Sequence, residues 1–216
     1  MFRMLLIHVA LAFEAKPFLR AADLKQVASP AGGRLFLNGE SSLALAVTGV
    51  GGDRTERVLK ATRDALSRRA LAVQCGLNVG LAGILNRSHP IGSILRIGRI
   101  RHGAALSDTH PEIALETQSA TFRWLGSFPL AELTTLDKIA CDSQAEPAPS
   151  GRPFLVDMEG WHFAQTLLRT FRIGPSGIAS VKIISDLADG TRIDTQALAA
   201  QYDGAVTRLL QGRPPD

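Results

Sequence analysis

The chain has 216 residues, of which 45% are hydrophobic and 20% are charged, and its formal net charge is +4. This length and balance fit a globular protein with a sizeable core and exclude the fibrous and intrinsically disordered classes. The lysines and arginines are scattered along the chain instead of being concentrated on one face or helix, so we expect no nucleic-acid partner.

The N-terminal segment is apolar and is predicted to form a buried strand from about Arg3 to Leu11. An arginine followed by apolar residues also resembles a signal peptide. His8 interrupts this run, however, and the segment continues directly into Glu14 and the start of a helix. We therefore expect no signal peptide. No other stretch has the roughly 20 apolar residues of a membrane-spanning helix.

Apolar segments of strand length alternate with segments of helical periodicity along the rest of the chain. Gly80 to Gly83 is expected to form a Gly-rich turn, and Asp142 to Pro153 is expected to form a loop. Pro17 lies near the expected start of the first helix. The further expected strands are Arg34 to Asn38, Ser42 to Thr48, Leu71 to Val79, Ile91 to Ile100, Ser119 to Leu125, Leu133 to Ile139 and Ile178 to Ser185. The expected helices are Glu14 to about Ala22, Thr55 to about Ala70, Leu155 to Phe171 and Asp194 to Gln211.

This alternation predicts an α/β protein of three layers, α/β/α, with a mixed central sheet and helices on both faces. Residues 1–211 are expected to form one domain and residues 212–216 a disordered tail. Ligands of such folds bind at the carboxyl ends of the strands. Three acidic residues, Glu14, Glu159 and Asp186, follow expected strands or loops. A lone carboxylate there is usually a helix cap or a solvated loop residue, and the sequence does not show whether the three converge.

Several segments together resemble the nucleoside phosphorylase superfamily, and within it the methylthioadenosine/adenosylhomocysteine nucleosidase branch. The most specific part is Met158-Glu159-Gly160 followed by Ile184-Ser185-Asp186, whereas Gly-rich turns recur in many α/β folds. The likeness covers nearly the whole chain. The segments that carry it are Ala10 to Glu14, Thr48 to Gly51, Asn78 to Gly83, Leu133 to Asp137, Val156 to Gly160 and Ile183 to Asp189.

The resemblance implies an enzyme that breaks the bond between a purine base and a ribose. It implies that Asp186 protonates the leaving base, that Glu14 activates the attacking water and that Glu159 binds the ribose hydroxyls. It also implies that Met158 packs under the sugar and that Ser185 helps to hold Asp186.

The remaining implied site residues lie in two other segments. Gly80, Ala82 and Gly83 would form a loop at the nucleophile site, and Ile139 and Ala140 would meet the base edge. Two positions depart from the family pattern. Leu81, in the substrate site, stands where a Ser or Thr is frequent, and Ile139 stands where an aromatic residue commonly stacks on the purine. Trp161 and His162 replace residues that are usually small, which suggests an altered pocket or dimer contact.

Three functions remain open at this point. Hydrolysis of a purine nucleoside, with a 5′-modified one as a variant, to free base and sugar is favoured, because no Gly-Asp-Pro-x-Arg phosphate signature follows the first strand. Phosphorolysis to ribose 1-phosphate is the alternative, since Arg54, Arg57 and Arg87 could still reach a phosphate. A nucleoside-binding protein without catalysis is the third, motivated by Leu81 and Ile139.

We expect no cofactor and no metal, because His8, His89 and His162 lack the spacing of metal ligands. The resemblance implies a homodimer or a larger homo-oligomer. Cys75 and Cys141 are too few for a disulfide framework, which favours a reducing, cytoplasmic location. Residues 101–111, which include His102 and His110, correspond to a variable region of the family, where a surface loop is favoured over a lid.

Overall fold

A computed structural model describes residues 4–103, 111–116, 120–137, 151–188 and 194–211. The predicted base-contacting residues Ile139 and Ala140 and the predicted tail 212–216 lie outside these ranges. Among the described residues, no helix combines the length and the apolar character needed to cross a membrane.

One mixed sheet, whose strands pair in the order β10-β6-β8-β9-β5-β1-β4-β3-β2 with β7 beside β6, organises the described residues. Long strand β5 pairs with both β10 and β9, so that β10, β6, β8, β9 and β5 form a closed ring of strand pairings. The strands are β1 (Met4–Val9), β2 (Lys25–Ala28), β3 (Arg34–Leu37), β4 (Leu43–Val47), β5 (Val73–Ile84), β6 (Ile94–His102), β7 (Glu112–Ala114), β8 (Leu130–Thr135), β9 (Phe154–Asp157) and β10 (Ile178–Asp186).

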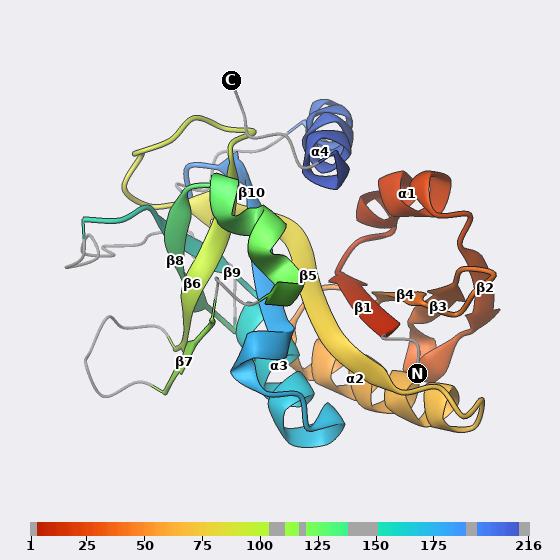
Figure 1. Cartoon of the computed structure of the whole chain (residues 1–216). Coiled ribbons are helices and arrows are strands. Elements are labelled where there is room, and N and C mark those ends of the chain that lie inside the picture. Colours follow the sequence, from red (N-terminus) through yellow and green to blue (C-terminus); the bar gives the residue numbers. More distant parts are fainter. Residues whose placement is uncertain (1–3, 104–110, 117–119, 138–150, 189–193, 212–216) are drawn as a thin grey trace.

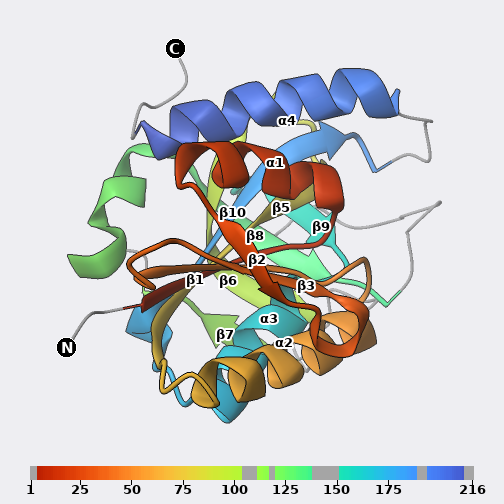
Figure 2. The same ribbon diagram turned by 90° about the vertical axis from the view of Figure 1, so that its right-hand side faces the viewer.

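Helices cover both faces of this sheet (Figures 1 and 2). Helices α1 (Ala12–Ala21) and α4 (Thr195–Leu210) lie together on one face, and α2 (Gly52–Ser67) and α3 (Gly160–Thr166) lie together on the other. Short 3-10 turns span Pro30–Gly32, Ala120–Ser127 and Pro175–Gly177, and a π-helical turn spans Leu167–Phe171. The predicted three-layer α/β/α fold with a mixed sheet is therefore confirmed.

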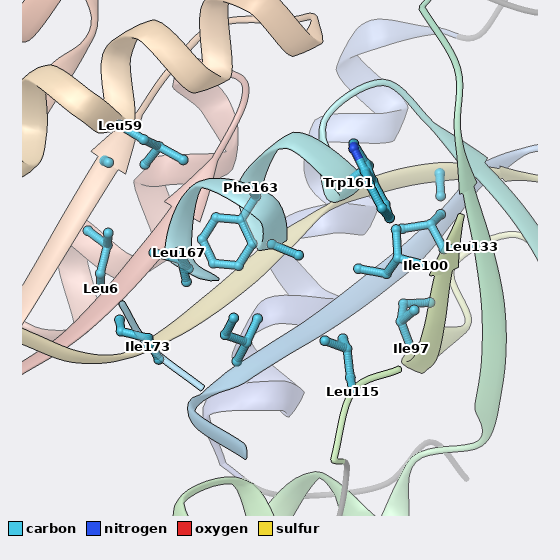
Figure 3. Close-up of a cluster of buried hydrophobic side chains, with 14 of the residues drawn as sticks. Leu6, Leu59, Ile97, Ile100, Leu115, Leu133, Trp161, Phe163, Leu167 and Ile173 are labelled. Carbon is cyan, nitrogen blue, oxygen red and sulfur yellow. The ribbon is translucent and has the colours of Figure 1, made fainter. Parts of the chain in front are cut away.

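The core has two parts because successive side chains of a strand point to opposite faces of the sheet. Leu6 packs with Leu59, Phe163 and Leu167 on the face covered by α2 and α3 (Figure 3). Its neighbour Ile7 belongs to a second cluster, on the face covered by α1 and α4. Both parts are built from side chains that are almost fully buried.

Two predicted elements differ in type from the structure. The predicted helix Leu155 to Phe171 is wrong over its first part, which forms β9, and α3 begins only at Gly160. A short apolar run such as Phe154–Val156 fits a strand or a buried helix equally well by periodicity, and its pairing with β8 and β5 decides the outcome. The predicted strand Ser119 to Leu125 is also wrong, because Ala120–Ser127 is 3-10 helix.

Smaller differences concern glycine, proline and element bounds. Gly80 to Gly83 does not form a turn, because β5 continues to Ile84 and pairs with β10 along this stretch. Pro17 lies inside α1 instead of near its start. Strand β8 begins earlier than predicted and ends at Thr135, and β2 was not predicted.

Candidate active site

Glu14 lies in the first turn of α1 and is 1% exposed. Its Oε2 accepts hydrogen bonds from the backbone N–H groups of Ala10 and Leu11 at 2.9 and 2.7 Å, and its Oε1 accepts one from the N–H of Leu81 at 3.2 Å. Burial raises the pKa of Glu14, and these hydrogen bonds together with the charge of Lys182 act in the opposite direction. The carboxyl group is therefore fixed by the backbone of two elements and is poised to take up a proton.

Lys182, in the middle of β10, is a buried cation beside Glu14 that the sequence analysis did not assign to the site. A Cβ atom added to Gly80 would lie 3.3 Å from Lys182 Nζ and 3.6 Å from Glu14 Oε1, so both groups cover the backbone of Gly80. A Cβ atom at residue 80 would therefore be in contact with both groups. The sequence signal was a single lysine inside the otherwise uncharged strand Ile178 to Ser185.

Asp157 neutralises Lys182, with 2.7 Å between Asp157 Oδ2 and Lys182 Nζ, and both side chains are at most 1% exposed. The Thr135 hydroxyl donates to Asp157 Oδ1 at 2.7 Å, and the Gly160 N–H donates to Oδ2 at 2.8 Å. A buried ion pair is tolerated only when its remaining hydrogen-bonding capacity is met in this way. The pair joins β10 to the end of β9 and the start of α3.

Glu159 directly precedes α3, and its Oε1 accepts a hydrogen bond from the Gly51 N–H at 2.7 Å. Strand β9 pairs antiparallel with the end of β5, with Val156 opposite Gly83, and Glu159 comes two residues after the last residue of β9, Asp157. Burial, and then the negative charges of Asp157 and, more weakly, Glu14, raise the pKa of Glu159 to about 7. Lys182 and the Gly51 hydrogen bond lower it. Glu14, Asp157, Glu159 and Lys182 therefore form one electrostatic unit.

A stability measurement can test the raised pKa of Glu159. Between its ordinary pKa of 4.5 and its folded value of about 7, the folded protein holds a proton that the unfolded chain has lost, so this group makes stability fall as pH rises. We expect Glu159→Gln to raise the free energy of unfolding by roughly 2–3 kcal/mol above that window and to change it little below. Urea unfolding of both proteins at about pH 4 and about pH 8 checks this, and an equal difference at both pH values would contradict it.

Asp186 ends β10, further along the sheet than Lys182. Its Oδ2 accepts a hydrogen bond from the Ser185 hydroxyl at 2.5 Å, and its Oδ1 accepts one from the Ala188 N–H at 2.7 Å. A Cβ atom added to Gly83 would lie 2.8 Å from Asp186 Oδ1, so only glycine allows this approach. Gly83 is three residues beyond Gly80, about 10 Å along the strand at roughly 3.3 Å per residue.

The other predicted site residues are distributed around these acids. Leu81 contributes its backbone N–H to Glu14, while its partly buried side chain packs against the core. The carbonyl of Ala82, whose side chain is buried in the core, accepts a hydrogen bond from Ser185 Oγ at 3.2 Å. Met158 is half-buried and adjoins Glu159 in the chain. Arg54, a candidate for phosphate, donates from Nε to the Thr48 carbonyl at 2.9 Å.

Two residues before the acidic site along the strands, a row of buried polar side chains crosses β10, β5 and β1 and ends at Thr48, the residue that follows β4. Asn78 Oδ1 accepts from the Ser180 hydroxyl at 3.0 Å, Asn78 Nδ2 lies 2.7 Å from His8 Nδ1, and His8 Nε2 lies 2.9 Å from Thr48 Oγ1. Burial and the charge of Lys182 lower the pKa of His8 to about 3, so this imidazole is neutral at physiological pH. Ala10, Gly80 and Lys182 all lie at the acidic site. They come two residues after His8, Asn78 and Ser180, respectively. The row therefore fixes the strands that carry the site.

Tyr202 is another buried polar group on the Glu14 side of the site. It comes from α4, and its ring meets the edge of the Phe13 ring at a centroid distance of 5.9 Å. Burial and the charge of Glu14 raise the pKa of Tyr202 well above its usual value. Among the described residues, its hydroxyl has no hydrogen-bond partner.

No family model and no curated protein sequence matches the chain. Solved structures do match. The 5′-methylthioadenosine/S-adenosylhomocysteine nucleosidase of Helicobacter pylori, in complex with butyl-thio-DADMe-Immucillin-A, superposes with a TM-score of 0.71 at 15% identity, over 98% of this chain and 99% of that one. The futalosine hydrolase of H. pylori gives a TM-score of 0.71 at 16% identity, over 98% of both chains. The chain has the nucleosidase fold.

A plant enzyme extends this match beyond bacteria. The 5′-methylthioadenosine nucleosidase of Arabidopsis thaliana gives a TM-score of 0.74 at 18% identity, over 97% of this chain and 95% of that one. Because coverage is nearly complete in both directions, the likeness is not limited to a shared α/β substructure. The resemblance predicted from the sequence is confirmed at the level of the fold. The nucleosidase fold brings Glu14 and Glu159 together from segments 145 positions apart in the chain.

Proposed function

We propose that this protein is a nucleosidase that hydrolyses the N-glycosidic bond of a purine nucleoside to free base and sugar. The observation that carries the proposal is the meeting of Glu14 and Lys182 over Gly80, with Glu159 interacting electrostatically with both and with Asp186 about 10 Å further along β5, a span that a nucleoside can bridge. Nucleosidases that share the fold support it.

In this proposal the scissile bond joins the ribose C1′ to a purine nitrogen. As the bond breaks, its electron pair goes to the base, and Asp186 donates a proton to the departing purine. Water attacks C1′, and Glu14, whose pKa is raised by burial, takes the proton that the water loses. Solvent then returns a proton to Asp186 and removes one from Glu14, so that one water is consumed per turnover.

Glu159 would bind the ribose. A carboxylate accepts hydrogen bonds from both hydroxyls of a diol, and its negative charge stabilises the positive charge that develops on the sugar. Asp157 and Lys182 would act as positioning residues, because each interacts electrostatically with Glu159 and is held by the other. Met158 would pack under the sugar, and the segment that contains Ile139 and Ala140 would meet the base.

The charges near Gly80 favour water over phosphate as the nucleophile. Three buried acidic side chains, Glu14, Asp157 and Glu159, surround the single ammonium group of Lys182. In a buried setting a phosphate would be repelled by these carboxylates far more strongly than in water. Leu81 also offers no hydroxyl to bind a phosphate oxygen. Phosphorolysis therefore remains the less favoured reaction.

The fold shared with 5′-methylthioadenosine nucleosidases supports a substrate whose 5′ end carries a modification. We further propose a cytoplasmic homodimer, in keeping with the small number of cysteines and with the behaviour that the resemblance implies.

The decisive experiment is a panel of purine nucleosides that differ at the 5′ position, assayed for base release with and without inorganic phosphate. We expect base release that does not depend on phosphate, accompanied by one free sugar per base. If base release depended strictly on phosphate, the reaction would be phosphorolysis instead of hydrolysis. Calorimetric binding of a nucleoside without base release would instead identify a binding protein.

A further inference from the structure

His102, Asp137 and His162 meet where the ends of β6 and β8 approach the first turn of α3. Each offers one ligand atom, and the three atoms all lie within 4.8 Å of one another. We propose that this His-Asp-His cluster binds a divalent transition-metal ion of the Zn²⁺ type. The proposal is independent of the reaction that the acidic site performs.

The packing around the cluster holds its two imidazoles in place. His102 Nε2 lies 3.2 Å from Asp137 Oδ1, and the His102 ring stacks on Trp161 with a centroid distance of 5.8 Å and an interplanar angle of 20°. The rings of His102 and His162 meet edge to face at 5.0 Å. Three elements thus converge on one point, as a metal site with preformed ligands requires.

His162 provides a second, independent observation. Both of its ring nitrogens are buried, and neither has a hydrogen-bond partner among the described residues. A buried polar atom without a partner costs about 1–3 kcal/mol, and a metal bond would satisfy one of the two.

The donor set determines the class of ion. Two imidazoles and one carboxylate suit Zn²⁺ and its neighbours, whereas Ca²⁺ and Mg²⁺ prefer oxygen ligands. Bonds of about 2.0–2.2 Å place the ligands of one ion no more than roughly 4 Å apart. The three ligand atoms, all within 4.8 Å of one another, need only a small approach to reach this spacing. Three protein ligands leave a coordination position for water.

Sequence spacing could not reveal this cluster. His102, Asp137 and His162 are separated by 35 and 25 positions, so only the fold brings them together. The cluster is also distinct from the acidic site. The His162 ring packs against Gly52, whose neighbour Gly51 donates to Glu159. A bound ion would therefore brace the start of α3 beside the residue that we assign to ribose binding.

The test uses the full chain without an affinity tag, stripped of metal by a chelator and titrated with Zn²⁺ by calorimetry and with Co²⁺ by visible absorption. We expect one equivalent to bind, with cobalt bands typical of nitrogen and oxygen ligands. Asp137→Asn and His102→Gln should each weaken binding about tenfold or more, as loss of a ligand requires. His89→Gln is the matched control, because His89 is not a member of the cluster and its Nδ1 lies 3.3 Å from the Ser88 hydroxyl oxygen. This variant should bind the ion like the unchanged protein.

A separate measurement shows whether a variant loses metal binding because it no longer folds. Thermal unfolding without metal should be the same for Asp137→Asn and the unchanged protein, because the Asp137 side chain is exposed. Three outcomes overturn the proposal: no saturable binding of either ion, equal binding by all variants, or equal loss of binding in His89→Gln. The last two would mean adventitious binding to surface histidines only. None of these readouts depends on nucleoside turnover.

Discussion

Replacing Asp186 with Asn should lower the kcat of base release about 10²–10⁴-fold, which is the usual contribution of a positioned general acid. Asn has the same shape, and its side-chain oxygen can still accept the hydrogen bond that Ala188 N–H donates to Asp186 Oδ1. The amide cannot give up a proton to the leaving base. We therefore expect KM and the Kd of a bound nucleoside to change little while kcat collapses, as measured by steady-state kinetics and calorimetry.

Asp64→Asn is the matched control for this variant. Asp64 lies exposed on α2, where it pairs with Arg63, so the same chemical change there should leave both kinetic constants unchanged. An Asp186→Asn protein that kept most of its kcat would exclude Asp186 as the general acid. Loss of nucleoside binding in that variant would instead assign the residue to substrate binding.

Replacing Lys182 with Met should destabilise the protein by about 3–5 kcal/mol, the cost typical of removing one partner of a buried ion pair. Asp157, whose Oδ2 lies 2.7 Å from Lys182 Nζ, would keep its negative charge without a partner. Its side chain is closed to solvent, so water could not compensate that charge. Glu14 and Glu159 would lose the cation that lowers their pKa values. Urea unfolding near neutral pH measures the effect.

A second substitution distinguishes lost charge pairing from lost packing. Adding Asp157→Asn to Lys182→Met removes the orphaned charge while an amide oxygen can still accept from Thr135, so a large share of the stability should return. Lys60→Met on α2 is the surface control. Its exposed pair with Glu56 should contribute no more than about 0.5 kcal/mol. A double variant no more stable than Lys182→Met would contradict the charge explanation.

The elements with strong local patterns were predictable. Ile178 to Ser185 is a continuous apolar run and forms β10, and the helical spacing of Val58, Leu59, Ala65 and Leu66 identifies α2. Asp194 was placed at the start of the last helix, and it caps α4 through the N–H groups of Gln196 and Ala197. In each case one segment carries enough information by itself, since burial on one or both faces fixes its periodicity.

The rest depends on contacts between distant segments. Whether Phe154 to Asp157 forms a strand is decided by β8 and β5, and whether Gly80 to Gly83 turns or stays extended is decided by β10. The acids Glu14, Glu159 and Asp186 could be named from resemblance, but Lys182 and its bond to Asp157 could not. A lysine in an apolar strand signals a buried partner, and only the fold identifies that partner.

The polar row beneath the acids has a consequence for the order in which the chain can fold. Its members, His8, Thr48, Asn78 and Ser180, come from segments that are made early and late during synthesis, and Ser180 lies on β10, the last of the described strands. Strand β10 pairs with β5 on one side and β6 on the other, so the ring of strands closes only after residue 186 has been made. Until then one edge of β5 and the Asn78 carboxamide have no partner from β10. Closure of the sheet is therefore a late event, dominated by contacts between residues far apart in the chain, and such topologies fold slowly.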